Sequence, residues 1–217
     1  MNFKNKFTLN RKEKIDQRDI YRWLSVNIRY NSFKKKLKIV NITSAVKSEG
    51  VSTVSINLAN VSSNQYDKVL LIDFNLNDSK IHELMKSSNS GILFSRLSEG
   101  NLNEINYDIF PTITTTDNNI IYILSVGNDK TNFTSFFHNK LFESFLDRLR
   151  ELFDFIIFDC PPVLDCPEVI SLSNISDGTV LVVSQREAKI NNTQAAVKEL
   201  RRGGAEILGV VFNKVID

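Results

Sequence analysis

The sequence is poor in the residues that build metal centres and disulfide frameworks. It contains two cysteines and two histidines among 217 residues. Cys160 and Cys166 lie six residues apart without cysteine or histidine companions, which suits neither a zinc site nor a disulfide framework. His82 and His138 have no carboxylate or cysteine nearby in a catalytic pattern, so we expect ordinary surface or partly buried residues. A reducing cytoplasm is the setting that this composition favours.

Long apolar runs are missing as well. No uninterrupted run approaches the roughly 20 residues that are needed to span a bilayer. The N-terminal stretch MNFKNKFTLNRKEK has neither the apolar core nor the cleavage pattern of a secretion signal. With 42% apolar and 24% charged residues, the composition is typical of a soluble globular protein. The length suits one folded domain with an ample core.

Basic residues are concentrated at the beginning of the chain. Residues 1–40 contain 12 Lys/Arg and 3 Asp/Glu, whereas the remainder contains 15 and 22. We divide the chain into a basic N-terminal arm, residues 1–37, and an α/β domain, residues 38–217. Such an arm suggests an anionic partner, either a membrane surface or an acidic protein. A solvated arm that only keeps the chain soluble explains the same charge run.

One helix is expected inside the basic arm. Apolar residues at helical spacing, with arginines interleaved, predict an amphipathic helix over residues 17–30. The apolar positions are Ile20, Trp23, Leu24 and Ile28. We expect this helix to dock on the domain or on a partner. We expect Trp23 to be a packing anchor rather than a functional aromatic residue.

Short apolar runs alternate with helical patterns through the rest of the chain. Strands are expected at residues 38–43, 68–73, 120–124, 154–159, 179–184 and 207–213. Helices are expected near residues 52–64, 139–152, 167–175 and 190–203. Several strand runs, such as KVLLIDF and FIIFD, are continuously apolar, as in strands covered on both faces. The order predicts an α/β fold, a parallel sheet with helices on both faces, and residues 76–119 are expected to form loops and short helices.

Polar residues follow three of the expected strands. The first strand runs into a loop at residues 44–53, and two later strands end in Asp73 and Asp159. Ligands bind at the carboxyl ends of the strands in such a sheet. Loop N–H groups and a helix N-terminus bind phosphate, a hydroxyl can ligate a metal, and acids can hold its waters. Together these features predict a site for Mg²⁺ and a nucleotide, although the two acids can alternatively serve as caps or loop anchors.

The loop and several other segments resemble one known family. TSAVKSEGVSTVSINLA, residues 43–59, resembles the Walker A segment TSxxPGEGKSTxxxNLA of the bacterial tyrosine kinases of capsule and exopolysaccharide synthesis. RDIYRWLSVNIRY is similar to the upstream EAYRxLRTNIxF of that family, VLLIDFNLND to its VLLIDxDLR, and FDFIIFDCPPVLD to its YDxIIxDTPPVL. The likeness covers nearly the whole chain. It implies a P-loop NTPase-like three-layer fold, ATP or ADP with Mg²⁺ as cofactor, and protein-tyrosine kinase activity.

The resemblance also implies roles for residues at matching positions. Nucleotide binding falls to Glu49, Gly50, Val51, Ser52, Thr53 and Asn213, the last at the place expected for adenine recognition. Metal binding falls to Ser52, Asp73 and Asp159, and Asp73 is the candidate catalytic base. Cys160 stands at a threonine place and is interpreted as a small apolar replacement.

The chain departs from the family where the chemistry should occur. Val51 stands at the place of the Walker A lysine, and Asn75 at the second acid of the second motif. Asp19 and Ser25 replace two residues of the upstream oligomerisation motif, so we expect ring assembly to be weaker than in the family. The last tyrosine of the sequence is Tyr122, so we expect no equivalent of the tyrosine-rich tail where family members autophosphorylate. Lys47 lies four residues before Val51, an offset that does not fit a substitute lysine, so we expect it to be exposed.

These losses favour a degenerate tyrosine-kinase homologue that regulates or scaffolds capsular or exopolysaccharide synthesis and export. Its expected partner is the cytoplasmic tail of a membrane polysaccharide co-polymerase, or a kinase paralogue, at the inner face of the cell membrane. Peripheral membrane contact through the basic arm and a homo-oligomer are further expectations, and nucleic acid is not an expected partner. One alternative is an active ATP-dependent tyrosine kinase in which Lys47 or a partner's cation replaces Val51. Another is a partition-type positioning ATPase, whose loop has glycines where this chain has Lys47, Ser48 and Glu49.

Overall fold

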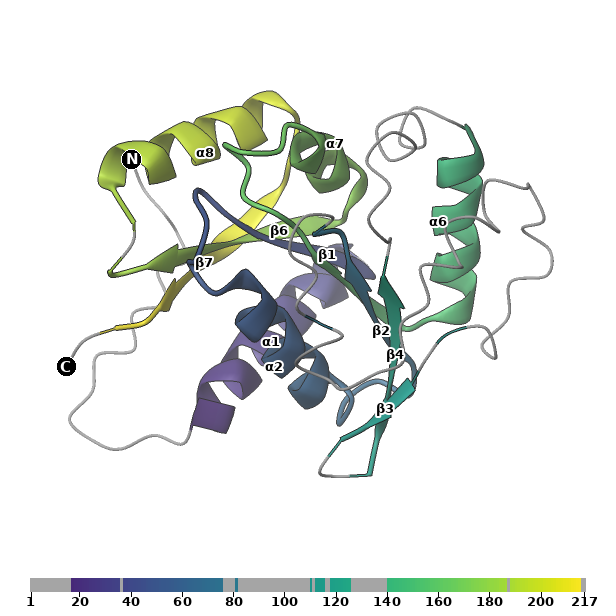
Figure 1. Cartoon of the computed structure of the whole chain (residues 1–217). Coiled ribbons are helices and arrows are strands. Elements are labelled where there is room, and N and C mark those ends of the chain that lie inside the picture. The colour runs from purple at the N-terminus through teal and green to yellow at the C-terminus, as the bar shows by residue number, and fades with distance from the viewer. Residues whose placement is uncertain are drawn as a thin grey trace.

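The strands assemble into a single twisted layer. This computed structural model describes residues 17–35, 37–75, 81, 110, 112–115, 118–125, 140–186 and 188–215. Among them, seven strands form one sheet in the order β3-β4-β2-β5-β1-β6-β7 (Figure 1). Their bounds are β1 Ile39–Ser44, β2 Val69–Asp73, β3 Thr112–Thr114, β4 Ile120–Ser125, β5 Phe155–Asp159, β6 Gly178–Ser184 and β7 Ile207–Asn213. Neighbouring strands are parallel except β3, which pairs antiparallel with β4, so the predicted α/β class is confirmed.

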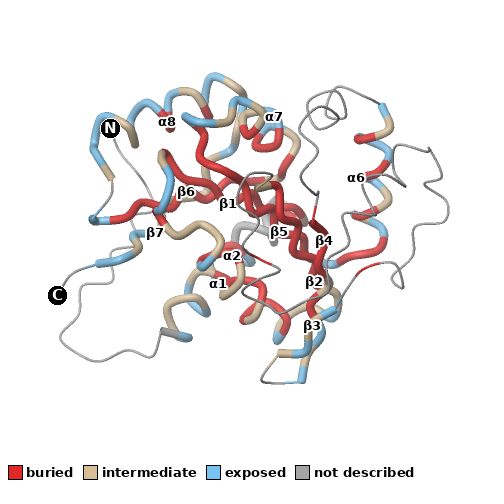
Figure 2. The backbone as a smooth tube through the Cα atoms, in the orientation of Figure 1, coloured by how far each residue is buried: buried red, intermediate tan, exposed pale blue. Residues whose placement is uncertain are grey.

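Helices cover both faces of the sheet. They are α1 Gln17–Lys35, α2 Val51–Ser62, α6 Lys140–Leu152, α7 Glu168–Ile175 and α8 Ile190–Arg202. α1 and α2 pack on one face, and α6, α7 and α8 on the other (Figure 1). In β5, Phe155 and Ile157 point to the first face, while Ile156 and Phe158 point to the second. The central strands are therefore buried on both sides (Figure 2), which is why their runs are continuously apolar.

The first helix extends further than expected and turns a different stripe to the domain. Ile28 is 3% exposed and Ser25 2% exposed, and the Ser25 Oγ lies 3.2 Å from the Ser62 Oγ of α2. Trp23 is 59% exposed, so its expected role as a packing anchor is wrong. The side of α1 that faces α2 contains Leu24, Ser25 and Ile28. Trp23 precedes Leu24 by one residue, which rotates its side chain by about 100° around the helix and away from this side.

One strand lies in the region that was expected to contain only loops and short helices. β3 is an edge strand in which Ile113 stands opposite Ile121 of β4. The expectation for residues 76–119 is therefore corrected. Three residues, of which one is apolar, are too short a run to predict a strand from the sequence.

Some predictions concern residues outside the described part of the chain. These are the basic residues 1–16 and the histidines His82 and His138. The division of the chain after residue 37 stays a prediction. Among the helices that the structure describes, none is both long enough and apolar enough to cross a membrane.

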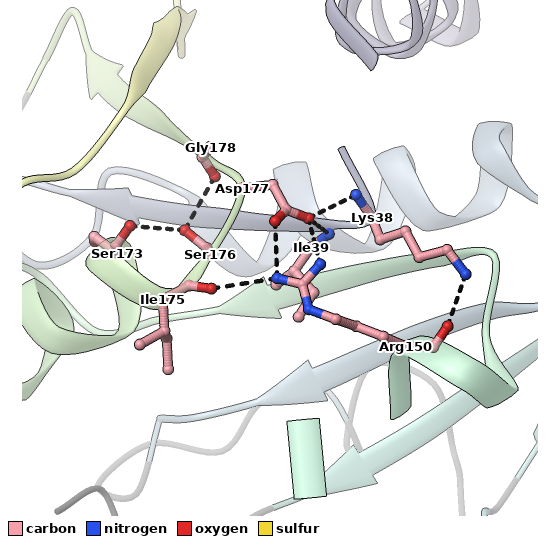
Figure 3. A network of polar contacts seen from close by, with 8 residues as sticks. All are labelled: Lys38, Ile39, Arg150, Ser173, Ile175, Ser176, Asp177 and Gly178. Atoms are coloured by element: carbon pink, nitrogen blue, oxygen red, sulfur yellow. Dashed lines mark hydrogen bonds and ion pairs between the residues drawn. The ribbon is translucent and has the colours of Figure 1, made fainter. Parts of the chain in front are cut away.

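A polar network joins the amino ends of β1 and β6 to the end of α6 (Figure 3). The Asp177 carboxylate accepts hydrogen bonds from the N–H groups of Lys38 and Ile39, both at 2.7 Å, and from two guanidinium nitrogens of Arg150, both at 2.8 Å. Burial raises the pKa of Asp177, but the Arg150 and backbone hydrogen bonds outweigh it, so the pKa is lowered. The network lies at the amino end of the sheet, opposite the carboxyl end, where ligands bind in folds of this kind.

Candidate nucleotide-binding site

The loop between β1 and α2 contains two residues with left-handed backbone. Ser48 has φ 65° and Gly50 has φ 94°. Gly50 requires glycine because side chains are disfavoured at this φ and because a Cβ would lie 2.0 Å from the Asn213 Nδ2. Ser48 stands where the resembled family has glycine, and its backbone keeps a conformation that glycine adopts at less cost. α2 begins at Val51, so the N–H groups of its first turn lie directly after the loop.

Glu49 holds the loop from inside. Its side chain is fully buried, and its Oε2 accepts hydrogen bonds from the N–H groups of Ala45 at 2.9 Å and Val46 at 3.0 Å. Its Oε1 accepts one from the N–H of Ser184, at the end of β6, at 3.1 Å. Three N–H donors offset the cost of burying a carboxylate. Both carboxylate oxygens of Glu49 therefore bind N–H groups of the protein itself. The predicted contact between Glu49 and a nucleotide stays a prediction, and the backbone of Glu49 is the part that could make it.

The end of β7 holds the same loop from the side. The Asn213 Nδ2 donates a hydrogen bond to the Glu49 O at 2.9 Å, and the Lys214 Nζ donates one to the Ser48 O at 2.5 Å. Lys214 itself has φ 52°. The structure thus places Asn213 beside Gly50, with its amide on the loop, and its expected recognition of adenine stays a prediction.

Two acids stand at the carboxyl ends of neighbouring strands on the other side of β1. Asp73 of β2 and Asp159 of β5 are register partners, and both are buried. Ser52 donates a hydrogen bond from its Oγ to the Asp159 Oδ2 at 2.8 Å, and Ser55 donates one to the Oδ1 at 2.9 Å. Burial, and next the charge of Asp73, raise the pKa of Asp159 to about 7, while the two serine hydrogen bonds lower it. The predicted metal ligands are therefore brought together.

The other residues that were singled out in the sequence lie in different environments around the loop and the end of β2. Val51 is half-buried and packs against the apolar cluster between the sheet, α1 and α2. Thr53 is exposed, and so is Lys47, as expected. Asn75 donates its backbone N–H to the Asp73 Oδ1 at 2.9 Å.

Three residues that sequence reasoning missed contribute to the site. They are Ser55, Ser184 and Lys214, which contact Asp159, Glu49 and Ser48 respectively. The position of Ser55 three residues after Ser52, on the same side of a helix, is a signal that can be read from the sequence. Ser184 and Lys214 act through contacts between distant segments, which leave no local pattern.

The two cysteines lie beside the site without taking part in it. Cys160 follows Asp159, is buried in the apolar core and has a pKa raised well above its usual value, first by burial. Burial also raises the pKa of Cys166 to about 12, and its Sγ donates a hydrogen bond to the Glu168 Oε2 at 3.1 Å. Both thiols stay protonated at neutral pH. The interpretation of Cys160 as a small apolar replacement is confirmed.

The oxygen donors at this edge of the sheet fit Mg²⁺. The hydroxyl of Ser52 and the carboxylates of Asp73 and Asp159 are the hard ligands that this ion prefers. The negative charge of Asp73 contributes to the raised pKa of Asp159. A bound cation would offset this repulsion between the two carboxylates. In the residues that the structure covers, no third Asp, Glu, His or Cys joins them in a group able to hold a metal. Phosphate oxygens and water would therefore complete the coordination.

A glycine-hinged loop between a buried parallel strand and a helix, with two strand-end acids beside it, defines a P-loop NTPase-like protein. The chain belongs to the AAA domain family, whose family model matches residues 37–201, and within it to the CpsD/CapB-like bacterial tyrosine kinases. The predicted family and fold are thus confirmed.

Known proteins of this kind match most of the chain. It is 28% identical to the tyrosine-protein kinase YwqD of Bacillus subtilis (strain 168), over 89% of this chain and 79% of the relative. It is also 28% identical to the tyrosine-protein kinase CpsD of Streptococcus pneumoniae serotype 4, over 91% and 84%. The crystal structure of the chimerical protein CapA2B2 has a TM-score of 0.78 at 24% identity, and the match covers 95% of this chain and 87% of that one.

Proposed function

We propose that this chain is a tyrosine-kinase homologue that binds nucleotide but has lost most of its phosphoryl-transfer activity. We propose that it regulates or scaffolds capsular or exopolysaccharide synthesis and export. The observation that carries the proposal is Val51. It stands at the place of the Walker A lysine, and its side chain packs against an apolar cluster instead of presenting a cation. Loss of one preorganised donor to developing charge typically costs about 10²–10³ in rate. Asn75 adds the loss of a carboxylate at the second acidic motif.

Nucleotide binding is supported by groups that do not depend on a lysine. The N–H groups and the dipole at the start of α2 favour a phosphate there. Ser52, Asp73 and Asp159 would hold Mg²⁺, which supplies positive charge against the phosphates when it is bound. Ser55 fixes the second oxygen of Asp159. Asp73 stands beside Asp159 as the candidate base toward an acceptor hydroxyl.

We infer that the partner is the cytoplasmic tail of a membrane polysaccharide co-polymerase, or a kinase paralogue, at the inner face of the membrane. The surplus of positive charge in residues 1–40 supports a place near an anionic surface. Trp23, Val26 and Tyr30 support a contact through α1, because they are 59%, 50% and 61% exposed. They recur at helical spacing, and an exposed apolar stripe of this kind marks an interaction surface.

Phosphoryl transfer and nucleotide binding can be measured separately on the whole chain. With [γ-³²P]ATP, Mg²⁺ and a tyrosine-containing polypeptide, we expect the protein to transfer no more phosphate than Asp159→Ala. We expect Mg·ADP to raise its Tm by mass action. Val51→Lys should bind Mg·ATP at least about tenfold more tightly, because a charge-assisted hydrogen bond contributes roughly 1.5–3 kcal/mol. Ser171→Lys is the matched control, since it adds the same charge at an exposed position of α7, on the other face of the sheet.

Each result has a distinct meaning. Transfer by the unaltered chain that Asp159→Ala abolishes would identify an active kinase and overturn the proposal. A Tm that Mg·ADP leaves unchanged would remove nucleotide binding from it. Equal gains from Val51→Lys and Ser171→Lys would show that net charge, rather than the lost lysine, sets the affinity.

A further inference from the structure

Two serines of α2 hold the carboxylate of Asp159, one on each oxygen. Ser52 donates its hydroxyl to the Oδ2 at 2.8 Å, and Ser55 donates its hydroxyl to the Oδ1 at 2.9 Å. The two serines differ in depth, because Ser52 is half-buried in the first turn of α2 whereas Ser55 is fully buried. The carboxylate is therefore held from the interior through Oδ1 and from the open side of the site through Oδ2.

Ser55 is placed to act through Asp159 rather than on a ligand directly. It lies about one turn further along α2 than Ser52, and it is 0% exposed. A buried hydroxyl needs a hydrogen-bond partner, and the Asp159 Oδ1 supplies it. The same bond restricts rotation of the carboxylate about its Cβ–Cγ bond, since Oδ1 must stay beside Ser55. Oδ2 is then the oxygen that Asp159 presents toward Ser52 and the start of α2.

We propose that Ser55 is a positioning residue, which limits Asp159 to one oxygen for a cation and thereby makes the site select Mg²⁺ over Ca²⁺. This role rests on the Mg²⁺ site of the proposed function. Mg²⁺ demands near-ideal octahedral geometry and keeps several waters, whereas Ca²⁺ takes more ligands in flexible geometry and accepts both oxygens of one carboxylate. A carboxylate that is fixed with a single oxygen outward suits the smaller ion. Outer hydrogen-bond partners orient the ligands of metal sites in this way.

Metal binding to the whole chain without nucleotide tests this role. Free Mn²⁺ is followed by electron paramagnetic resonance, and Mg²⁺ or Ca²⁺ is added to displace the bound Mn²⁺. We expect Ser55→Ala to weaken Mg²⁺ binding about 10- to 100-fold, as the loss of an outer hydrogen-bond partner does. Ca²⁺ binding should weaken much less, because the released carboxylate can offer both oxygens. Ser62→Ala is the matched control and should change neither affinity, since it removes a buried hydroxyl of the same helix that contacts Ser25.

The other outcomes overturn this role in distinguishable ways. Unchanged Mg²⁺ affinity in Ser55→Ala would show that Asp159 keeps its orientation without the hydroxyl, while the metal site stands. Equal losses for Mg²⁺ and Ca²⁺ would show that Ser55 supports the site without selecting the ion. An unaltered chain that binds no Mn²⁺ would end both this role and the proposed Mg²⁺ site. The Tm of each variant without metal checks that it is folded.

Discussion

Asp159 is a buried carboxylate that contacts two hydroxyls and faces a second acid. Its pKa of about 7 lies above the unfolded-state value near 3.9. The protonated side chain of Asp159 therefore makes its full contribution to the free energy of unfolding below the unfolded-state pKa. This contribution is lost as the pH rises through the folded-state pKa of about 7. In metal-free buffer, we expect Asp159→Asn to raise the Tm at pH 8 and to gain much less at pH 5. Urea unfolding should show that the gain differs by roughly 2 to 3 kcal/mol between these pH values.

Two controls separate charge from shape at this residue. Asp165→Asn makes the same substitution at an exposed carboxylate and should change the Tm little at either pH. Mg²⁺ should raise the Tm of the unaltered chain at pH 8 more than that of Asp159→Asn, because a cation takes the place of the proton. An equal loss of stability in Asp159→Asn at both pH values would contradict the raised pKa.

At the scale of the element, the loop between β1 and α2 contains a serine, Ser48, in a left-handed backbone conformation that favours glycine. A left-handed residue other than glycine costs about 1–2 kcal/mol, while glycine costs about 0.5–1 kcal/mol of backbone entropy. We expect Ser48→Gly to be neutral or to stabilise by up to about 1 kcal/mol in urea unfolding. Lys47→Gly, at a neighbour without positive φ, should destabilise by about 0.5–1 kcal/mol. Equal losses in the two variants would show that the φ of Ser48 carries no cost.

Elements with long continuous patterns could be predicted from the sequence, and contacts between distant elements could not. The run FIIFD predicts β5. Because the carboxyl ends of parallel strands meet at one edge of the sheet, where ligands bind, Asp159 at the end of β5 could be predicted to lie near Asp73 at the end of β2, as it does. β3 has a single apolar residue and gives no such signal. The bond from the Ser184 N–H to Glu49 joins residues 135 positions apart. Helical spacing predicts α1, but the choice of Trp23 for its buried face fails because packing on α2, through Ser25, decides which stripe is covered.

At the scale of the whole molecule, the two ends of the sheet are stabilised differently. The carboxyl end gathers acids that repel one another, at Asp73 and Asp159, whereas the amino end pairs Asp177 with Arg150. The first arrangement lowers the stability of the protein at the edge of the sheet where we propose that a cation binds, and the second raises it at the edge where no ligand is expected. The fold thus concentrates its electrostatic strain on the side of the loop.

The network at the amino end should make the protein sensitive to acid. Because the pKa of Asp177 is lowered, its contribution is present above the unfolded value near 3.9 and is lost as the pH falls through the folded value. We expect Asp177→Asn to lower the free energy of unfolding at pH 7 by roughly 1 to 3 kcal/mol, and this loss to shrink below about pH 4. Glu151→Gln breaks an exposed ion pair with Arg148 on α6 and should cost less than about 0.5 kcal/mol. If Asp177→Asn lowers the free energy of unfolding by the same amount from pH 7 to pH 3, the charge of the carboxylate does not contribute. The packing of the side chain, rather than its charge, would then hold α6 against the sheet.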